Sequence, residues 1–171
     1  MILVALGSNL PGPAGPPEAQ VAAALEMLGR RAIAVLRRSR YWRSPAWPDP
    51  AEPAFVNAVA VVATVLSPRA LLAELHAVEA ALGRVRGRPN APRTLDLDLL
   101  DYDGRILPGG DGAPALPHPR MTTRAFVLLP LADVAPDWRH PVSGVGLATL
   151  VAALGPDHGT VPLGEAEASP G

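Results

Sequence analysis

Hydrophobic residues recur along the chain with spacings that distinguish strands from helices. Runs or alternations of apolar residues are typical of strands, and apolar positions three or four residues apart are typical of amphipathic helices. These patterns predict strands over residues 2–6, 33–42, 54–65 and 94–102. They predict helices over residues 18–28, 68–82, 123–134 and 146–154, with Ser67 capping the second and Pro130 unfavourable inside the third.

The order of these elements indicates the fold class. The first six follow the β-α-β-β-α-β order of the ferredoxin-like motif, and the last two helices are additions. We therefore predict an α+β fold in which two helices pack on one face of an antiparallel sheet. A length of 171 residues fits one domain, which we place at residues 1–154. Residues 155–171 lack periodicity and are predicted to form a flexible tail.

Two segments between these elements have unusual compositions. Residues 43–53 hold four prolines and are called the proline loop. Residues 83–92 hold three arginines and are called the arginine loop. A further loop is predicted over residues 109–114. The two named loops separate the predicted strands and helices where candidate functional residues gather.

Charge and composition exclude several classes of protein. The 15 basic and 16 acidic residues leave no net basic field, so nucleic-acid binding is not expected. Cysteine is absent, which excludes disulfides and thiolate metal sites. The apolar start is too short for a signal peptide or a membrane span, so we expect a cytoplasmic protein without membrane association. Neither a P-loop nor a Gly-x-Ser-x-Gly motif occurs.

Leucine and aspartate alternate over residues 95–99. Alternate residues of a strand face opposite sides, so the leucines would face the core while Asp96 and Asp98 share the other face, roughly 7 Å apart. Two such carboxylates repel each other unless a cation lies between them. Hard oxygen ligands favour Mg²⁺, bound together with substrate phosphates. The alternative is an amphipathic strand with a solvated polar face.

Arginines accompany this acidic pair in the sequence. Arg93 lies three residues before Asp96, and the arginine loop lies just upstream. Because guanidinium groups bind phosphate oxygens bidentately, carboxylates beside an arginine loop suit a polyphosphate; the alternative is a solvated basic loop. His118 and Arg124 lie on or near a proline-flanked turn and are further candidates for phosphate contact, unless this is only a structured turn.

Asn57 and Phe55 follow the proline loop. An amide can read the donor and acceptor edge of a heterocycle, and an aromatic ring can stack on it. The alternative role for the aromatic residues near this loop, Trp42, Trp47 and Phe55, is to fill the core. His76 and Glu79 lie three residues apart on a predicted helix, either as a ligand-facing pair or as an ordinary surface pair.

Residues 92–99, Pro-Arg-Thr-Leu-Asp-Leu-Asp-Leu, resemble the signature of the 6-hydroxymethyl-7,8-dihydropterin pyrophosphokinases, a family of folate biosynthesis. Four further blocks resemble the family in the same order, at residues 5–10, 55–58, 79–86 and 116–121. The resemblance extends over residues 2–154. It implies an enzyme that passes diphosphate from ATP to the hydroxymethyl group of a reduced pterin, with AMP as the other product. It also implies a monomer without an obligate protein partner.

The resemblance also implies roles for individual residues. Asp96 and Asp98 would hold two Mg²⁺ ions, and Arg84 and Arg93 would contact the transferring phosphates. The implied ATP-binding residues are His76, Glu79, Arg86, Leu99, His118 and Arg124. The implied pterin-binding residues are Ser44, Pro45, Trp47, Phe55, Asn57 and Phe126. We expect the proline loop and the arginine loop to close over the substrates and exclude water.

Some positions depart from the family pattern, and two other interpretations remain. The arginine loop lacks the tryptophan that many members have near Asn90, and Ala113, Ala115 and Pro119 replace other frequent residues, which leaves the adenine and ribose contacts unassigned. A ferredoxin-like sheet could instead be a non-catalytic module that binds RNA, although the acids at Asp96 and Asp98 argue against it. A kinase of the same class could also act on a different alcohol.

Overall fold

The computed structural model describes residues 1–164. The first half contains β1 (Ile2–Ser8), α1 (Pro17–Gly29), β2 (Ala34–Arg38), β3 (Trp42–Ser44), β4 (Phe55–Ala63) and α2 (Pro68–Ala81). The second half contains β5 (Asp96–Tyr102), β6 (Leu107–Gly110), β7 (Ala113–Leu116), a 3-10 turn (Met121–Thr123), α3 (Ala125–Val134), α4 (Leu147–Ala152) and β8 (Val161–Pro162). Among these residues no helix is long and apolar enough to cross a membrane.

The central sheet is antiparallel, as predicted. Its strands run in the order β5-β1-β4-β3-β8, and β2 pairs with β4 beside β3. This order is compatible with a ferredoxin-like core, in which the two predicted β-α-β units interleave. The pairing places Gly7 between Asn57 on β4 and Asp96 on β5. Strand register therefore brings together two of the segments that the sequence marked for chemistry.

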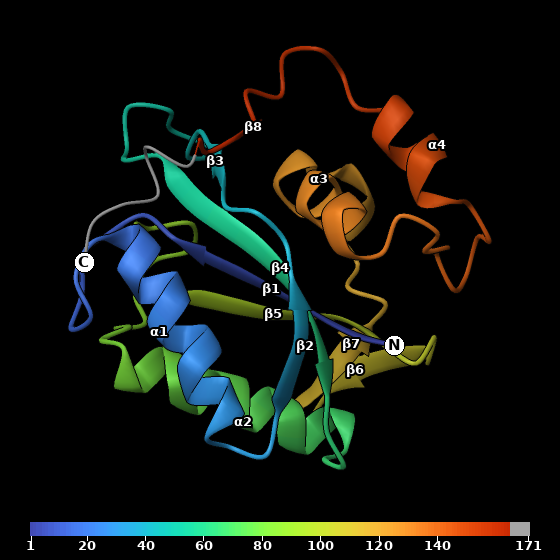
Figure 1. The fold of residues 1–171 in the computed structure, drawn as a ribbon, viewed down its shortest axis with the longest axis horizontal. Coiled ribbons are helices and arrows are strands. Elements are labelled where there is room, and N and C mark those ends of the chain that lie inside the picture. The colour runs from blue at the N-terminus through green and yellow to red at the C-terminus, as the bar shows by residue number, and fades with distance from the viewer. Residues whose placement is uncertain (165–171) are drawn as a thin grey trace.

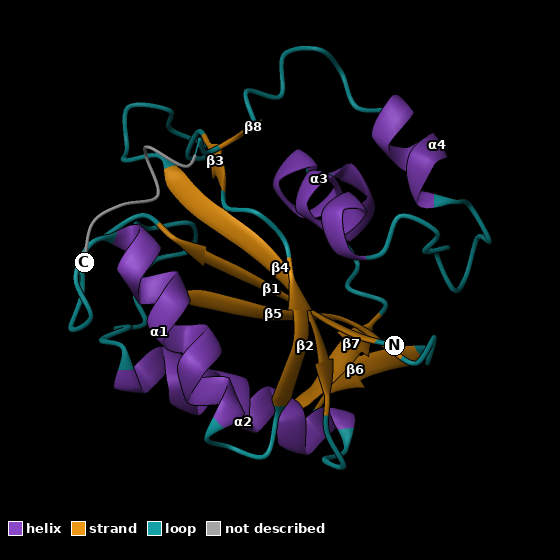
Figure 2. Cartoon of the chain, viewed as in Figure 1, coloured by secondary structure: helices purple, strands orange, loops and turns teal. Residues whose placement is uncertain are grey.

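Helices cover both faces of this sheet (Figures 1 and 2). Helices α1 and α2 pack on one face through a core that includes Leu28 and Leu75, and this is the predicted arrangement. Helices α3 and α4 lie on the opposite face, over a second core that includes Leu128 and Leu147. Pro130 is buried within α3, which continues to Val134 despite it. The α3 face is the one on which the candidate site lies.

The predicted strand over residues 33–42 is wrong as a single element. It forms two strands, β2 and β3, which are separated by residues 39–41. Ser39 is buried in this break, where its hydroxyl accepts a 3.0 Å hydrogen bond from the Val59 amide. Because a side chain takes over a ladder hydrogen bond here, the backbone can bend between the two strands.

Two segments predicted to lack structure contain strands. The loop expected over residues 109–114 is part of the β6–β7 hairpin, whose turn has positive φ at Gly110, Asp111 and Gly112. The predicted flexible tail is wrong for residues 161–163, because β8 pairs with β3 and Leu163 is buried in the core. Residues 165–171 lie outside the described residues.

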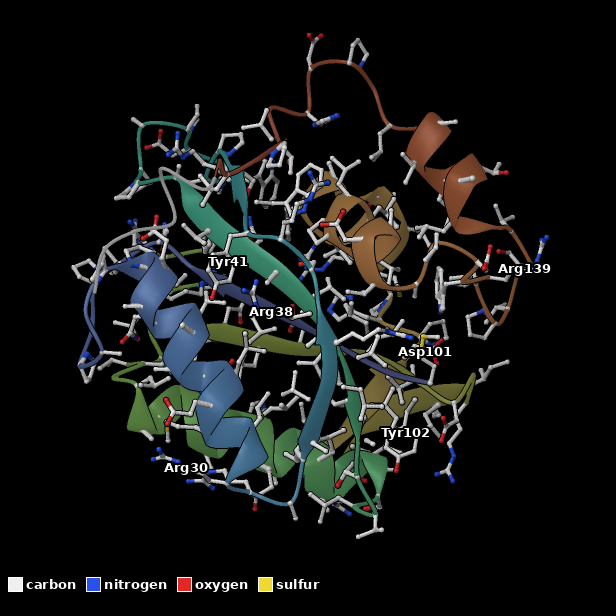
Figure 3. The ribbon with its side chains drawn as sticks, viewed as in Figure 1. Arg30, Arg38, Tyr41, Asp101, Tyr102 and Arg139 are labelled. Atoms are coloured by element: carbon white, nitrogen blue, oxygen red, sulfur yellow. The ribbon has the colours of Figure 1, made fainter. Side chains whose placement is uncertain are left out.

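Buried polar contacts fix the second half of the chain to the sheet. Asp101 on β5, which is labelled in Figure 3, is 4% exposed. Its Oδ2 accepts a 2.8 Å hydrogen bond from the Trp138 indole. Its Oδ1 accepts a 2.8 Å hydrogen bond from the Gly104 amide. This acid is therefore a structural group, unlike the two acids that precede it on the same strand.

Candidate active site

Asp96 and Asp98 lie at the start of β5, opposite Gly7 and Ala5 of β1. The leucines between and beside them are buried in the core, so the predicted alternation is confirmed. The aspartates face the other side, with 28% and 35% of their side chains exposed. They open into a small hollow lined by Ala5, Leu6, Gly7, Asn57, Asp96, Asp98, Phe126 and Val127.

Asp96 is held by two arginines. Arg84 Nη1 donates to Oδ1 at 2.6 Å, and Arg93 Nη1 donates to Oδ2 at 3.0 Å. Both guanidinium groups are largely buried, with 18% and 20% of their side chains exposed. Each carboxylate oxygen thus has a charge-assisted partner of its own, which strengthens the arrangement. The arginines that the sequence marked for phosphate binding are thereby brought to the edge of the hollow.

Asp98 has looser contacts than Asp96. His118 Nε2 and Arg124 Nη1 each lie 3.9 Å from its Oδ2, beyond hydrogen-bonding distance. The pKa of Asp98 is raised to about 6, chiefly by burial and then by the nearby Asp96 charge, against the lowering effect of Arg124, Arg84 and Arg93. A cation at this place would favour the ionised carboxylate.

His118 is held neutral beside this acid. Burial lowers its pKa to about 4, and the positive charges of Arg124 and Arg120 act in the same direction. Its Nδ1 accepts a hydrogen bond from the Arg120 amide at 3.2 Å, which leaves the hydrogen of the neutral ring on Nε2. The His118 amide donates to the Leu100 carbonyl at 2.8 Å and fixes the turn against β5. His118 therefore presents an N–H donor to the site.

Glu79 lies in the last turn of α2 and is only 3% exposed. Its Oε1 accepts hydrogen bonds from Arg84 Nη1 at 2.8 Å and from the Leu97 amide at 2.7 Å. Burial raises its pKa to about 7, against the lowering effect of the Leu97 hydrogen bond and of the Arg84 charge. Glu79 therefore joins α2 to β5 and orients Arg84. His76, one turn earlier, has its pKa lowered by burial and then by the charges of Arg86 and Arg84.

The arginine loop forms the wall of a separate cleft of about 250 Å³. Residues 84–93 and Arg120 line it. Because Arg84 and Arg93 belong to this cleft and also contact Asp96, the cleft adjoins the acidic pair. A basic cleft next to two carboxylates suits a polyphosphate that carries a cation.

Asn57 forms the polar side of the hollow. It is 4% exposed, and its Nδ2 donates to Ser44 Oγ at 2.9 Å. A Cβ on Gly7 would lie 3.2 Å from Asn57 Oδ1 and 3.7 Å from the Phe55 ring, so the glycine keeps this side open. Since Ser44 engages the nitrogen, the carbonyl oxygen is the atom that remains for a ligand.

Several predicted site residues lie outside this hollow. Trp47 is 69% exposed on the proline loop, and Pro45 is exposed and lies near Gly159. The Leu99 side chain packs in the core with α1 and α2, so only its backbone is available for a nucleotide. The side chain of Glu79 likewise turns to Arg84 and β5 rather than to an open surface.

The donor set fits a magnesium site that substrate completes. The described residues hold no group of three or more His, Asp or Glu side chains arranged for a metal. The carboxylates of Asp96 and Asp98 supply hard oxygen ligands from one face. Mg²⁺ commonly takes one or two carboxylates together with phosphates, so two acids are sufficient.

Comparison with known proteins decides the family. Residues 3–136 match the model of the 7,8-dihydro-6-hydroxymethylpterin-pyrophosphokinase family. The chain belongs to this family. Two relatives named 2-amino-4-hydroxy-6-hydroxymethyldihydropteridine pyrophosphokinase are similar along most of their length. The one from Pseudomonas aeruginosa is 44% identical over 89% of this chain and 90% of its own, and the one from Methylorubrum extorquens is 43% identical over 77% and 80%. Pyrophosphokinase activity in folate biosynthesis follows from this membership.

Some similar proteins are much longer than this pyrophosphokinase chain. It spans 19% of the folic acid synthesis protein fol1 of Pneumocystis carinii, to which it is 38% identical. Its structure matches Plasmodium falciparum HPPK-DHPS with a TM-score of 0.66, covering 88% of this chain and 40% of that one. Because the sequence identity is only 13%, this likeness supports the fold alone.

Sequence reasoning missed two buried amides that connect the segments around the candidate site. Asn9, just after β1, is 2% exposed and contacts Pro53 of the proline loop and Arg93, the residue that follows the arginine loop. Gln20 on α1 is fully buried, and its Nε2 donates to the Leu82 and Thr94 carbonyls, at 2.8 and 3.1 Å, on either side of the arginine loop. The sequence did contain a sign of this role: Gln20 is a polar residue that lies four positions before Ala24, within the apolar stripe of its helix.

Proposed function

We propose that the protein transfers the terminal diphosphate of ATP to the hydroxymethyl oxygen of 6-hydroxymethyl-7,8-dihydropterin, with Mg²⁺ held by Asp96 and Asp98. The hydroxyl oxygen bonds to the β-phosphorus and loses its proton, while the bond from that phosphorus to the oxygen of AMP breaks. The observation that carries the proposal is the position of the acidic pair, with a basic cleft on one side and the Asn57 hollow on the other.

The pterin side is built around Asn57. Because Ser44 Oγ accepts from its Nδ2, the Oδ1 atom is oriented as an acceptor for an N–H group on the pterin edge. Phe126 lines the same hollow and Phe55 lies beside Gly7, so the two rings would flank a flat heterocycle. Ser44 and Pro45 would complete the pocket, together with Trp47 once the proline loop closes.

The phosphate side is built around the arginines. Magnesium at the acidic pair would offset phosphate charge and lower the pKa of the attacking hydroxyl. Arg84 and Arg93 line the cleft and contact Asp96, and their charge would stabilise the transferring diphosphate. His118 and Arg124 would bind phosphate oxygens near Asp98, with His118 acting as a neutral donor. Arg86 would contribute from the arginine loop, and His76 from the adjoining face of α2.

The same arrangement addresses the competing reaction with water. Closure of the proline and arginine loops over both ligands would keep water from the β-phosphorus.

We further propose that the chain works as a monomer and in the cytoplasm. Support for independent action comes from relatives such as the Pseudomonas enzyme, 90% of whose length this chain covers.

The experiment is an assay of the nucleotide product. The protein is incubated with ATP, Mg²⁺ and 6-hydroxymethyl-7,8-dihydropterin, and the nucleotides are separated by chromatography. We expect AMP in an amount equal to the pterin diphosphate, and loss of both when Mg²⁺ is removed by a chelator and recovery when it is restored. ADP as the product would contradict diphosphate transfer. Full activity with an unrelated primary alcohol would contradict the role of the Asn57 hollow.

A further inference from the structure

Asn9 lies at the point where β1 ends and the two named loops meet. Its side chain is buried, although its amide is among the most polar of uncharged groups. A buried amide is costly unless its donor and acceptor are both satisfied. In Asn9 the two ends of the amide bind two segments far apart in the sequence, at Arg93 and at Pro53.

One end holds Arg93, the residue that directly follows the arginine loop and so fixes where that loop ends. Asn9 Oδ1 accepts a hydrogen bond from the Arg93 amide at 2.8 Å. The Asn9 and Leu10 amides donate to the Arg93 carbonyl at 3.1 and 3.2 Å. Both backbone polar groups of Arg93 are thus fixed by the end of β1. The Arg93 side chain continues from this anchor to Asp96.

The other end holds the proline loop. Asn9 Nδ2 donates to the Pro53 carbonyl at 3.0 Å. Pro53 lies two residues before Phe55, where β4 begins and the Asn57 hollow is formed. A displacement of the proline loop at Pro53 therefore acts on the same side chain that holds Arg93.

Within residues 1–164 the loops also approach each other through an exposed ion pair, which is weak. Arg88 and Glu52 approach to 3.8 Å, with 78% and 35% of their side chains exposed. Exposed pairs of this kind contribute little free energy. The Asn9 amide is the buried connection, and its hydrogen bonds are formed only when both loops keep their positions.

We propose that Asn9 is a positioning residue that couples the binding of the two substrates, through its simultaneous hydrogen bonds to Arg93, which directly follows the arginine loop, and to Pro53 of the proline loop. This inference rests on the proposed assignment of those loops to the nucleotide and the pterin. Nucleotide that orders the arginine loop fixes Arg93, Arg93 fixes the Asn9 amide, and the amide holds Pro53. By linkage, pterin must tighten nucleotide binding by the same factor.

The decisive variant is Asn9→Asp. Its carboxylate still accepts from the Arg93 amide but has no N–H for the Pro53 carbonyl, so the variant breaks the connection to the proline loop without removing the contact to Arg93. The pterin dissociation constant is measured with and without the Mg²⁺ complex of α,β-methylene-ATP, which cannot release AMP. In the wild type we expect the nucleotide to tighten pterin binding by roughly 5- to 150-fold, the usual range of coupling.

In Asn9→Asp we expect this factor to fall below about twofold, while the dissociation constant for nucleotide alone changes little, because the bond to Arg93 is kept. The matched control is Arg88→Ala, which removes only the exposed contact between the loops and should retain the wild-type factor. Equal coupling in Asn9→Asp and the wild type would overturn the proposal. So would loss of coupling in Arg88→Ala alone.

A measurement on the wild type covers the case in which the variant does not fold. Hydrogen–deuterium exchange of residues 46–54 is followed after addition of the nucleotide analogue alone. The coupling predicts slower exchange in this proline-loop segment, although the nucleotide is assigned to the other loop. Unchanged exchange, with the arginine loop protected, overturns the coupling and leaves the proposed function standing. If the wild type binds neither ligand, both proposals fail.

Discussion

Arg84 donates a 2.6 Å hydrogen bond to Asp96, one of the two acids proposed to hold magnesium. The guanidinium charge compensates Asp96 in the described structure, whereas Asp98 has cationic contacts only at 3.9 Å. The two acids therefore differ in electrostatic environment although they share one face of β5. Asp98 is the acid whose oxygens are more available to an incoming cation.

Asp98→Asn should therefore lose turnover while the fold is kept. Replacing one of two neighbouring carboxylates removes repulsion and leaves the leucine core untouched, so we expect a thermal midpoint equal to or above that of the wild type. Activity should fall by more than about 100-fold, the scale of losing one electrostatic contact in a transition state. Steady-state rates and thermal unfolding test both parts. Asp103→Asn, an exposed acid just after the same strand, is the control and should keep full activity. Near-normal turnover in Asp98→Asn would refute the metal assignment.

Asn57→Ala should weaken pterin binding far more than nucleotide binding. The change removes the acceptor that Ser44 orients, and one or two lost hydrogen bonds correspond to about 1–3 kcal/mol. Calorimetry with each ligand separately gives the comparison. Ser44→Ala keeps the acceptor but frees the amide to rotate, so its effect on pterin should be smaller and in the same direction. Equal weakening of both ligands by Asn57→Ala would contradict a pterin-specific role.

Arg93→Ala should lower kcat strongly and leave the ATP dissociation constant nearly unchanged. Its guanidinium lies beside the transferring diphosphate in the proposed arrangement, and the loss of such a contact reduces the rate by about 10²–10³-fold. Single-turnover rates and nucleotide binding separate the two effects. Arg88→Ala, which changes an exposed member of the same loop region, should do much less. If Arg93→Ala mainly weakens ATP binding while chemistry proceeds normally, Arg93 is a ground-state anchor.

Gln20→Leu should destabilise the protein without altering any residue of the acidic pair. The Gln20 amide joins the carbonyls on both sides of the arginine loop and accepts from the Ala14 amide at 2.8 Å. Leaving these buried groups without partners should cost about 1–3 kcal/mol for each unsatisfied group. Denaturant unfolding measures this loss. Gly12→Ala tests the same hydrogen bonds in a second way. The added Cβ would lie 2.5 Å from Gln20 Nε2 and would displace the Gln20 side chain. Unchanged stability in both variants would show that these bonds are dispensable.

The parts of the site that the sequence predicted are those governed by local patterns. Asp96 and Asp98 follow from strand alternation, and the cap at Ser67 follows from local hydrogen bonding, which the structure has at 3.2 Å to the Ala70 amide. Local patterns could not predict contacts between segments that are far apart in the sequence. The break at Ser39 depends on an amide of β4, and the burial of Leu163 depends on the edge offered by β3. The roles of Asn9 and Gln20 depend on loops far away in the sequence. A polar residue at the end of a strand or within an apolar stripe was their only local sign.

The central claim is that a diphosphate, and not a single phosphate, leaves ATP. The most direct measurement uses ATP labelled at the β-phosphorus, with the pterin substrate and Mg²⁺, and follows the label into the separated products. Diphosphate transfer through the site at Asp96 and Asp98 predicts that the β-label appears in the pterin product and that the AMP is unlabelled. Retention of the β-label in ADP, with a pterin monophosphate as the other product, would contradict the account.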